Sequence, residues 1–189
     1  MSDTNQRKTL RLPYYDYSQA GAYFVTLVAQ RRANLFSEVN QEALKLFPAG
    51  EMLAHWWKKL AEYFSGVTPG EFVIMPNHFH GILEFTRDLP NSSLIIDESI
   101  ADAPNNNNIE DIDPTLSQVM QWFKTMTTNE YIRGVKQSRW EPFDRRLWQR
   151  SYFEHIIRND EDYERICLYI QSNPQQWDMD QENPNNSIK

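Results

Sequence analysis

Two histidines separated by one residue, His78 and His80, are the first candidates for chemistry, because the chain contains only four histidines. They lie in Glu71–Phe85, an apolar segment typical of a strand or a bent pair of strands. Side chains alternate along a strand, so both imidazoles share one face while Phe79 points to the other. Two imidazoles so placed can hold one divalent cation, such as Mn or Zn. A pair of structural histidines has the same pattern, so the metal site is a hypothesis.

A second candidate group lies on a helix near the end of the sequence. Its apolar stripe has the spacing i, i+3, i+4, i+7 and consists of Tyr163, Ile166, Cys167 and Ile170. Tyr169 lies off this stripe, and Asn173 follows it by about one turn. A tyrosine hydroxyl can act as a covalent nucleophile when it is activated, and an amide oxygen can complete a metal shell. A tyrosine at the boundary of a core has the same placement.

Arginines alternate with aromatic residues between Trp140 and Arg158. The residues that would contact DNA are Arg145, Arg146, Trp148, Arg150, Tyr152 and Arg158. Guanidinium groups suit phosphates, and rings suit unstacked bases. A strand that uses its rings for the core would show the same composition, and both interpretations stay open.

The elements that must position these residues follow from local pattern. We expect strands at Tyr23–Ala29, Ala43–Phe47 and Leu147–Ile157, with the turn Thr68–Gly70 preceding the histidine segment. Apolar residues of Phe79's parity predict a core on that face: Val73, Met75, Leu83 and Phe85. Three helices are predicted, from Pro48, from Asp113–Pro114 to about Arg133, and from Asn159 or Asp160 to about Ser172. Hairpin-like pairs of strands with intervening helices predict an antiparallel α+β sandwich.

Charge is distributed unevenly along the chain, whose net charge is −7. The stretch 97–113 holds six acidic residues and no Lys or Arg, whereas Met120–Arg158 has eight basic and four acidic residues. With its Asn run and prolines, 87–114 is predicted to be a mobile acidic insertion. Residues 178–189 are predicted to form a flexible tail. Within a single domain 1–189, this pattern is compatible with a locally basic surface that suits an anionic partner and equally with an ordinary acidic protein whose charges are scattered.

Composition excludes several classes of protein. Neither G-x-G-x-x-G nor G-x-x-x-x-G-K-[ST] occurs, so dinucleotide-binding and P-loop sites lack their signatures. The single cysteine excludes an intrachain disulfide and a multi-cysteine metal site. The polar N-terminus shows no signal peptide, and the longest apolar stretch is far below the roughly 18 residues that span a membrane. We therefore expect a cytoplasmic protein with no membrane partner.

Three ordered motifs resemble the REP-associated tyrosine transposases. They are Arg11–Thr26, with the run Tyr15-Asp16-Tyr17-Ser18-Gln19-Ala20-Gly21; Val73–Ile82, with Pro76-Asn77-His78-Phe79-His80; and Leu147–Asn159 with Leu168–Pro174. The second is similar to the family's HUH motif, in which two histidines flank a hydrophobic residue. The similarity covers nearly the whole chain except 87–114 and the tail.

The resemblance implies a ferredoxin-like α+β fold, an antiparallel sheet with helices packed on it. It also implies a single-tyrosine nuclease that cuts and rejoins single-stranded DNA beside hairpins. His78 and His80 match the family's metal pair, which would take Mg or Mn. Tyr169 matches the nucleophile that forms a 5′-phosphotyrosine, and Asn173 falls near a third ligand. The implied partner is single-stranded or hairpin DNA, and the active form is a monomer or a homodimer.

Two alternatives remain open. The acidic insertion and the low isoelectric point of about 5.1 are compatible with a copy that binds hairpin DNA without cleaving it. The histidine pair is also compatible with a phosphodiesterase whose metal activates water. That enzyme would retain activity when Tyr169 is replaced by Phe, whereas the transposase would lose it.

Overall fold

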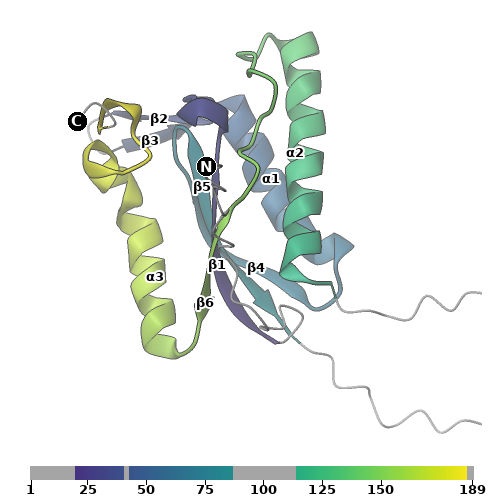
Figure 1. Ribbon diagram of the computed structural model, residues 1–189, viewed down its shortest axis with the longest axis vertical. Coiled ribbons are helices and arrows are strands. Elements are labelled where there is room, and N and C mark those ends of the chain that lie inside the picture. Colours follow the sequence, from purple (N-terminus) through teal and green to yellow (C-terminus); the bar gives the residue numbers. More distant parts are fainter. Residues whose placement is uncertain (1–19, 41–42, 87–113, 187–189) are drawn as a thin grey trace, which may run out of the picture.

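The computed structural model describes residues 20–40, 43–86 and 114–186. A four-stranded antiparallel sheet has the order β4-β5-β1-β6. Helices α1 and α2 cover one face of this sheet, and α3 lies on the other face (Figure 1). The bounds of these elements are β1 Gly21–Val28, α1 Pro48–Tyr63, β4 Val67–Ile74, β5 His78–Phe85, α2 Leu116–Ser138, β6 Phe153–Ile157 and α3 Asp160–Ser172. The predicted α+β architecture is confirmed.

The larger core lies between the sheet and the pair α1 and α2. Trp57 of α1 is fully buried and contacts Phe79 of β5 and Phe123 of α2, with ring centroids 4.7 and 5.5 Å apart. Gly81 is required beneath this indole, because a Cβ there would lie 2.6 Å from a ring carbon of Trp57. The absence of a side chain at position 81 therefore lets α1 approach the strand that carries the histidines.

The predicted strand pair around Pro76 is confirmed, but two details of the prediction are wrong. Thr68–Gly70 is part of β4, with a bulge between Pro69 and Phe72, rather than a turn. β4 is an edge strand, where the missing N–H of a proline is tolerated. Val73 and Met75 pack in a smaller cluster with Ile82 on the α3 face, opposite Phe79. The turn at Pro76 and Asn77 resets the alternation, so parity does not continue from β4 into β5.

The helices begin and end close to their predicted positions. Thr115 caps α2 through a reciprocal capping box with Gln118, so this helix begins just after Pro114 and continues to Ser138, beyond the predicted end. The side chain of Asn159 accepts from the backbone N–H of Asp162, as expected of the cap of α3. The helix α3 ends at Ser172, next to Pro174, which places Tyr169 in its last turn.

Shorter elements surround one end of the sheet. The predicted strand at Ala43–Phe47 is β3 (Ala43–Leu46), and it pairs with β2 (Ser37–Asn40), which was not predicted. Of the expected strand Leu147–Ile157, only Phe153–Ile157 forms a strand, β6. Before it, Trp148 makes an isolated antiparallel bridge with Ala29. The described residues also form short 3₁₀ helices: η1 (Gln30–Arg32), η2 (Asn173–Met179) and η3 (Pro184–Asn186).

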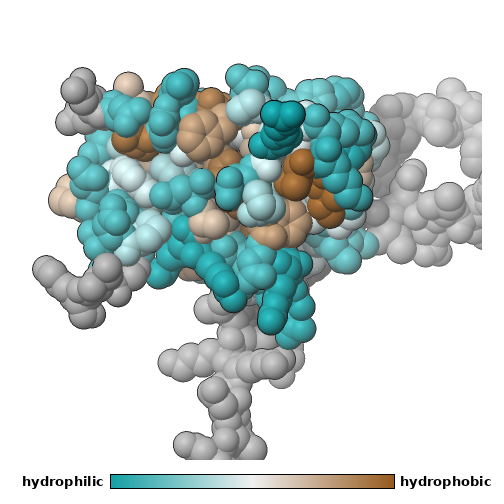
Figure 2. Space-filling view, turned by 90° about the horizontal axis from the view of Figure 1, so that it is seen from above, coloured by the Kyte–Doolittle hydropathy of each residue, from teal (hydrophilic) through white to brown (hydrophobic). Residues whose placement is uncertain are grey.

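The structure describes little of the predicted acidic insertion but most of the predicted tail. Residues 87–113, nearly all of the predicted acidic insertion, lie outside the described residues. Of the tail predicted to be flexible, residues 178–179 end η2 and residues 184–186 form η3, with residues 180–183 connecting the two. The end of the molecule at the top of Figure 1 is mostly hydrophilic, with separate hydrophobic groups (Figure 2). Within the described residues, every helix is too short or too polar to span a lipid bilayer.

Candidate metal centre and catalytic site

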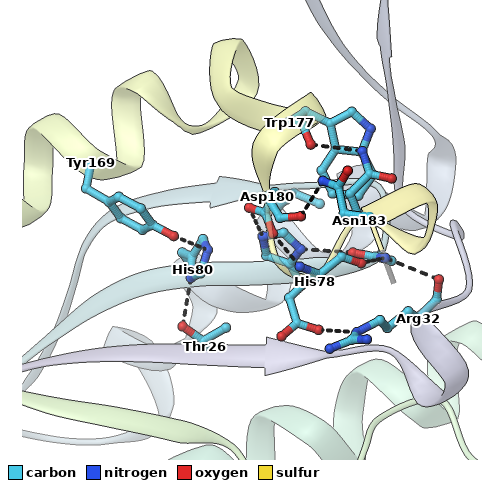
Figure 3. A network of polar contacts seen from close by, with 12 residues as sticks. Thr26, Arg32, His78, His80, Tyr169, Trp177, Asp180 and Asn183 are labelled. Atoms are coloured by element: carbon cyan, nitrogen blue, oxygen red, sulfur yellow. Dashed lines mark hydrogen bonds and ion pairs between the residues drawn. The ribbon is translucent and has the colours of Figure 1, made fainter. Parts of the chain in front are cut away.

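Strand β5 brings His78 and His80 to the α3 face of the sheet, as the alternation predicted. Both side chains are buried, with exposed fractions of 0% and 5%, and their ring centroids lie 4.6 Å apart. The ring of Phe24, from the neighbouring strand β1, stacks on His80 with a centroid separation of 5.2 Å. Two imidazoles are thus held side by side by rigid strands (Figure 3).

Hydrogen bonds orient both rings. The amide nitrogen of Asn77 donates to the backbone carbonyls of Arg32 and Glu182, so its oxygen faces His78 and accepts from Nδ1 at 2.9 Å. This leaves Nε2 of His78 with a free lone pair, and Nε2 has no hydrogen-bond partner among the described residues. Nδ1 of His80 lies 2.7 Å from the hydroxyl of Thr26, which turns its Nε2 toward α3. Such outer partners fix the tautomer and direction of metal-binding histidines.

Tyr169 of α3 points at this pair (Figure 3). Its hydroxyl lies 3.3 Å from Nε2 of His80, and its ring meets the edge of Phe24. The side chain is 39% exposed, so a substrate can reach it. Burial of the hydroxyl and then the carboxylate of Asp180 raise the pKa of Tyr169, while the side chain of Asn173 acts to lower it. An unassisted phenol here is therefore protonated at neutral pH.

Two oxygen donors complete the group. Asn173 is 1% exposed, and its side-chain oxygen has no hydrogen-bond partner among the described residues. Asp180, which follows η2, brings Oδ2 to 3.7 Å from Nε2 of His78. His78, His80 and Asp180 each offer a ligand atom, and these atoms lie within 4.8 Å of one another. Sequence reasoning missed Asp180, because no local pattern separates it from the other acids of the tail.

The electrostatics of this group suit a divalent cation. Burial lowers the pKa of His78 to about 4, and burial together with the neighbouring His78 lowers the pKa of His80 well below its usual value. Both imidazoles are therefore neutral at pH 7, the state in which they bind metals. Burial raises the pKa of Asp180, while a hydrogen bond from the backbone N–H of Glu182 and the charge of Arg32 act to lower it. Two buried donors without hydrogen-bond partners and one carboxylate are compatible with a divalent metal ion.

The segment after η2 forms one wall of a cavity of about 480 Å³. Its walls include Phe24, His80, Phe153, Tyr169, Asp180 and Glu182. The guanidinium of Arg32 donates to the carboxylate of Glu182 at 2.7 Å, and Asn183 donates to the carbonyl of Trp177 at 2.9 Å. These contacts hold Asp180 against the histidines, so the end of the chain is part of the site (Figure 3).

The residues predicted to contact DNA divide into three groups. Arg145, Arg146, Arg150 and Tyr152 line a second cavity, beside α2. Trp148 also reaches this cavity, but it is 4% exposed and its indole N–H donates to Thr127 in the core, so it offers little ring surface to a base. Arg158 follows the far end of β6 and does not line the cavity. Tyr163 packs against the smaller cluster, as predicted, and its hydroxyl donates to Glu84.

Comparisons with known proteins agree with this architecture, although no protein-family model matches the chain. An uncharacterized protein from Haemophilus influenzae (strain ATCC 51907 / DSM 11121 / KW20 / Rd) is 32% identical over 178 residues, which are 94% of this chain and 93% of that protein. A protein of the same strain named "Putative REP-associated tyrosine transposase" is 22% identical, over 84% of this chain and 73% of its own length.

Among solved structures, that of a REP-associated tyrosine transposase bound to a REP hairpin matches 88% of this chain and 74% of its own. Its TM-score is 0.55, at 21% sequence identity. The resemblance found in the sequence motifs is thereby confirmed. The chain belongs to one family with the uncharacterized Haemophilus influenzae protein, and it has the fold of the REP-associated tyrosine transposases.

Proposed function

We propose that the protein is a single-tyrosine DNA transposase-like enzyme. It binds single-stranded DNA flanked by a hairpin, and cleaves and rejoins this DNA through a 5′-phosphotyrosine on Tyr169. The observation that carries the proposal is the position of the Tyr169 hydroxyl, 3.3 Å from His80 and in an open cavity that borders the metal-donor group. The structural neighbour bound to a REP hairpin supports DNA as the substrate class.

His78, His80 and Asp180 would hold the metal, with Asn173 as a further oxygen donor. When bound, a divalent ion supplies charge that stabilises the developing negative charge on the phosphate. Asn77 and Thr26 keep both imidazole rings in position through their hydrogen bonds. The last turn of α3 presents the Tyr169 hydroxyl for in-line attack, and Phe24 restricts its ring from the side.

The bond changes balance without an external energy source. The Tyr169 oxygen forms a bond to phosphorus and loses its proton, while the bond from phosphorus to the 3′ oxygen breaks and that oxygen gains a proton. The energy of the phosphodiester is kept in the phosphotyrosine. A 3′-hydroxyl that attacks the phosphotyrosine restores a DNA strand and frees Tyr169. Rejoining therefore requires no nucleoside triphosphate.

The decisive experiment is adduct formation. Incubation with hairpin-flanked single-stranded DNA and MnCl₂ should give a covalent complex that mass spectrometry maps to Tyr169. Tyr169→Phe should remove the adduct and all cleavage. Tyr163→Phe is the matched control, because it lies on the same helix and keeps its packed ring, and it should retain activity. Cleavage that survives in Tyr169→Phe would support the metal-activated-water phosphodiesterase, and binding without cleavage would support the binding-only protein.

The metal centre can be tested without DNA. Calorimetric titration of the protein with MnCl₂ should show one site that disappears in His78→Gln and in His80→Gln. His155→Gln is the control, because His155 bonds instead to Asp162 of α3 at 2.8 Å. With DNA, His78→Ala should abolish cleavage while hairpin binding persists. Cleavage that continues in a chelator would contradict the metal-dependent mechanism.

A further inference from the structure

The cavity beside α2 is separate from the metal centre and has a distinct chemistry. Its volume is about 750 Å³, and its walls come from α2 and from the irregular segment that precedes β6. Four cationic side chains line it: Lys124, Arg145, Arg146 and Arg150. Neutral polar side chains of α2 face them, including Gln121, Thr125 and Asn129. No Asp or Glu is among the described residues of its lining.

This chemistry recognises a chain of phosphates. Guanidinium groups bind phosphate oxygens with paired hydrogen bonds, and amides and hydroxyls can bond to sugars or base edges. Within the described parts of the chain, no carboxylate forms an ion pair with Arg145, Arg146 or Arg150. Burial lowers the pKa of Lys124, and the positive charge of the nearby Arg146 lowers it further.

The wall that carries the arginines is held in place. Leu147 and Trp148 are buried in the larger core, and the carbonyl of Leu147 accepts from the backbone N–H of Gln30 at 2.8 Å. The ammonium group of Lys124 donates to the carbonyls of Gln149 and Arg150 at 2.7 and 3.0 Å. An irregular segment fixed in this way presents its cations without a large ordering cost on binding.

Two consecutive residues connect this cavity to the catalytic cavity. Tyr152 lines the basic cavity, and the next residue, Phe153, lines the catalytic cavity with 53% of its side chain exposed. Consecutive residues of extended chain point to opposite faces of a sheet. Phe153 begins β6, the edge strand on this side, so no further strand of the described sheet lies between the two cavities.

We propose that single-stranded DNA crosses the sheet edge at Tyr152 and Phe153, with its reacting phosphate at Tyr169 and neighbouring phosphates in the arginine cavity. This inference rests on the proposed function for the position of the reacting phosphate. The DNA strand then contacts both faces of the sheet. The α3 face performs the chemistry, and the face covered by α2 holds the DNA backbone.

Binding is tested first, with Tyr169→Phe as the background so that no cleavage occurs. The probes are fluorescein-labelled oligothymidylates of increasing length, and fluorescence anisotropy is measured over a range of NaCl concentrations. Arg146→Ala and Arg150→Ala should each weaken binding and reduce the slope of log K against log[salt] by about 0.7, the value for one phosphate contact on a single strand. Arg133→Ala, which lies on α2 outside the cavity lining and pairs with Glu130, is the matched control and should leave the slope unchanged.

The path of the DNA across the sheet edge is tested in proteins that retain Tyr169. Single neutral methylphosphonate links are placed along a cleavable hairpin substrate. In wild-type protein, neutral links at a cluster of positions on one side of the cleaved phosphate should weaken binding, and in Arg146→Ala these links should have no further effect. Equal losses in both proteins, or unchanged salt slopes in the arginine variants, would overturn the crossing. An adduct at Tyr169 alongside those results would leave the proposed function intact, whereas no adduct in any protein would refute the function itself.

Discussion

The two faces of the sheet are built from the same strands but differ in what they bury. Toward α1 and α2 the buried side chains are almost all apolar, with Tyr23, Trp57 and Phe123 at the centre. Toward α3 the apolar cluster is small, and it borders the buried polar side chains of His78, His80 and Asn173. The face toward α1 and α2 provides most of the hydrophobic stabilisation. The face toward α3 buries the polar groups of the candidate metal centre.

Alternation along a strand makes this division possible. Phe79 lies in the larger core while its neighbours His78 and His80 form the candidate metal centre. Burying polar donors without partners costs free energy, and the large dry core on the opposite face offsets that cost. Chemistry and stability should therefore respond to different substitutions, and four predictions test this separation.

The largest effect is on catalysis, with almost none on stability. Tyr169→Phe should remove all strand cleavage, because it deletes only the hydroxyl that lies beside His80. The ring is partly exposed, so the free energy of unfolding should change by less than about 0.5 kcal/mol. Urea denaturation alongside a cleavage assay measures both. A stability loss of several kcal/mol would show that the two faces are not independent.

A substitution in the larger core, toward α1 and α2, should have the opposite effect: a large loss of stability without loss of the metal site. Trp57→Ala should lower the free energy of unfolding by about 3–5 kcal/mol, because it empties the centre of the larger core. The fraction that remains folded should still bind Mn²⁺, since Trp57 contributes no atom to the donor set. Denaturation midpoints and calorimetric titration of the folded protein provide the comparison. A metal affinity that falls with stability would contradict the separation.

The pH dependence of stability should reveal the burial of His78. An unfolded histidine takes up a proton near pH 6.5, whereas His78 in the fold does so only near its pKa of about 4. The unfolded state therefore binds more protons between these values, and stability is fully present above pH 6.5 and is lost as pH falls toward 4. The loss from this residue alone should approach roughly 3 kcal/mol in the presence of a chelator. His78→Phe should show a flatter profile in this window, as measured by urea denaturation at each pH.

The smallest effect concerns the support of the metal pair. Asn77→Ala removes the oxygen that accepts from Nδ1 of His78, so the ring loses its fixed tautomer and direction. Outer partners of this kind are worth about 10- to 100-fold in metal affinity, and calorimetry with MnCl₂ should show a loss of that size. His155→Gln, which removes a ring bonded to Asp162 outside the donor set, is the control and should leave the affinity unchanged. Unchanged affinity in Asn77→Ala would mean that packing alone orients His78.

Much of the fold and three of the four candidate donors, His78, His80 and Asn173, were named from the sequence. Alternation predicted that His78 and His80 share a face, and the helical stripe separated Tyr163 from Tyr169. The parity of Val73 and Met75 was wrong, because a turn between two strands resets alternation. Thr68–Gly70 was mistaken for a turn, because an edge strand tolerates residues that a central strand does not.

Asp180 was beyond the reach of local pattern. In sequence it is one of several acids in a polar tail, and its role depends on a fold-back after η2 that brings it to His78. The contacts that create this fold-back join residues far apart, such as Arg32 with Glu182. No periodicity records such a pairing, so the donor from the tail emerges only from the folded structure.

These long separations have a consequence for synthesis. The contact of His80 with Tyr169 spans 89 residues, that of Asn77 with Glu182 spans 105, and that of Arg32 with Glu182 spans 150. During translation the N-terminal part of a chain leaves the ribosome and begins to fold first. A nascent chain that has emerged only as far as β6 contains both histidines but lacks the tyrosine of α3 and the carboxylate of Asp180. The full donor set therefore cannot assemble until the chain as far as Asp180 has emerged, and its fold-back also requires Glu182.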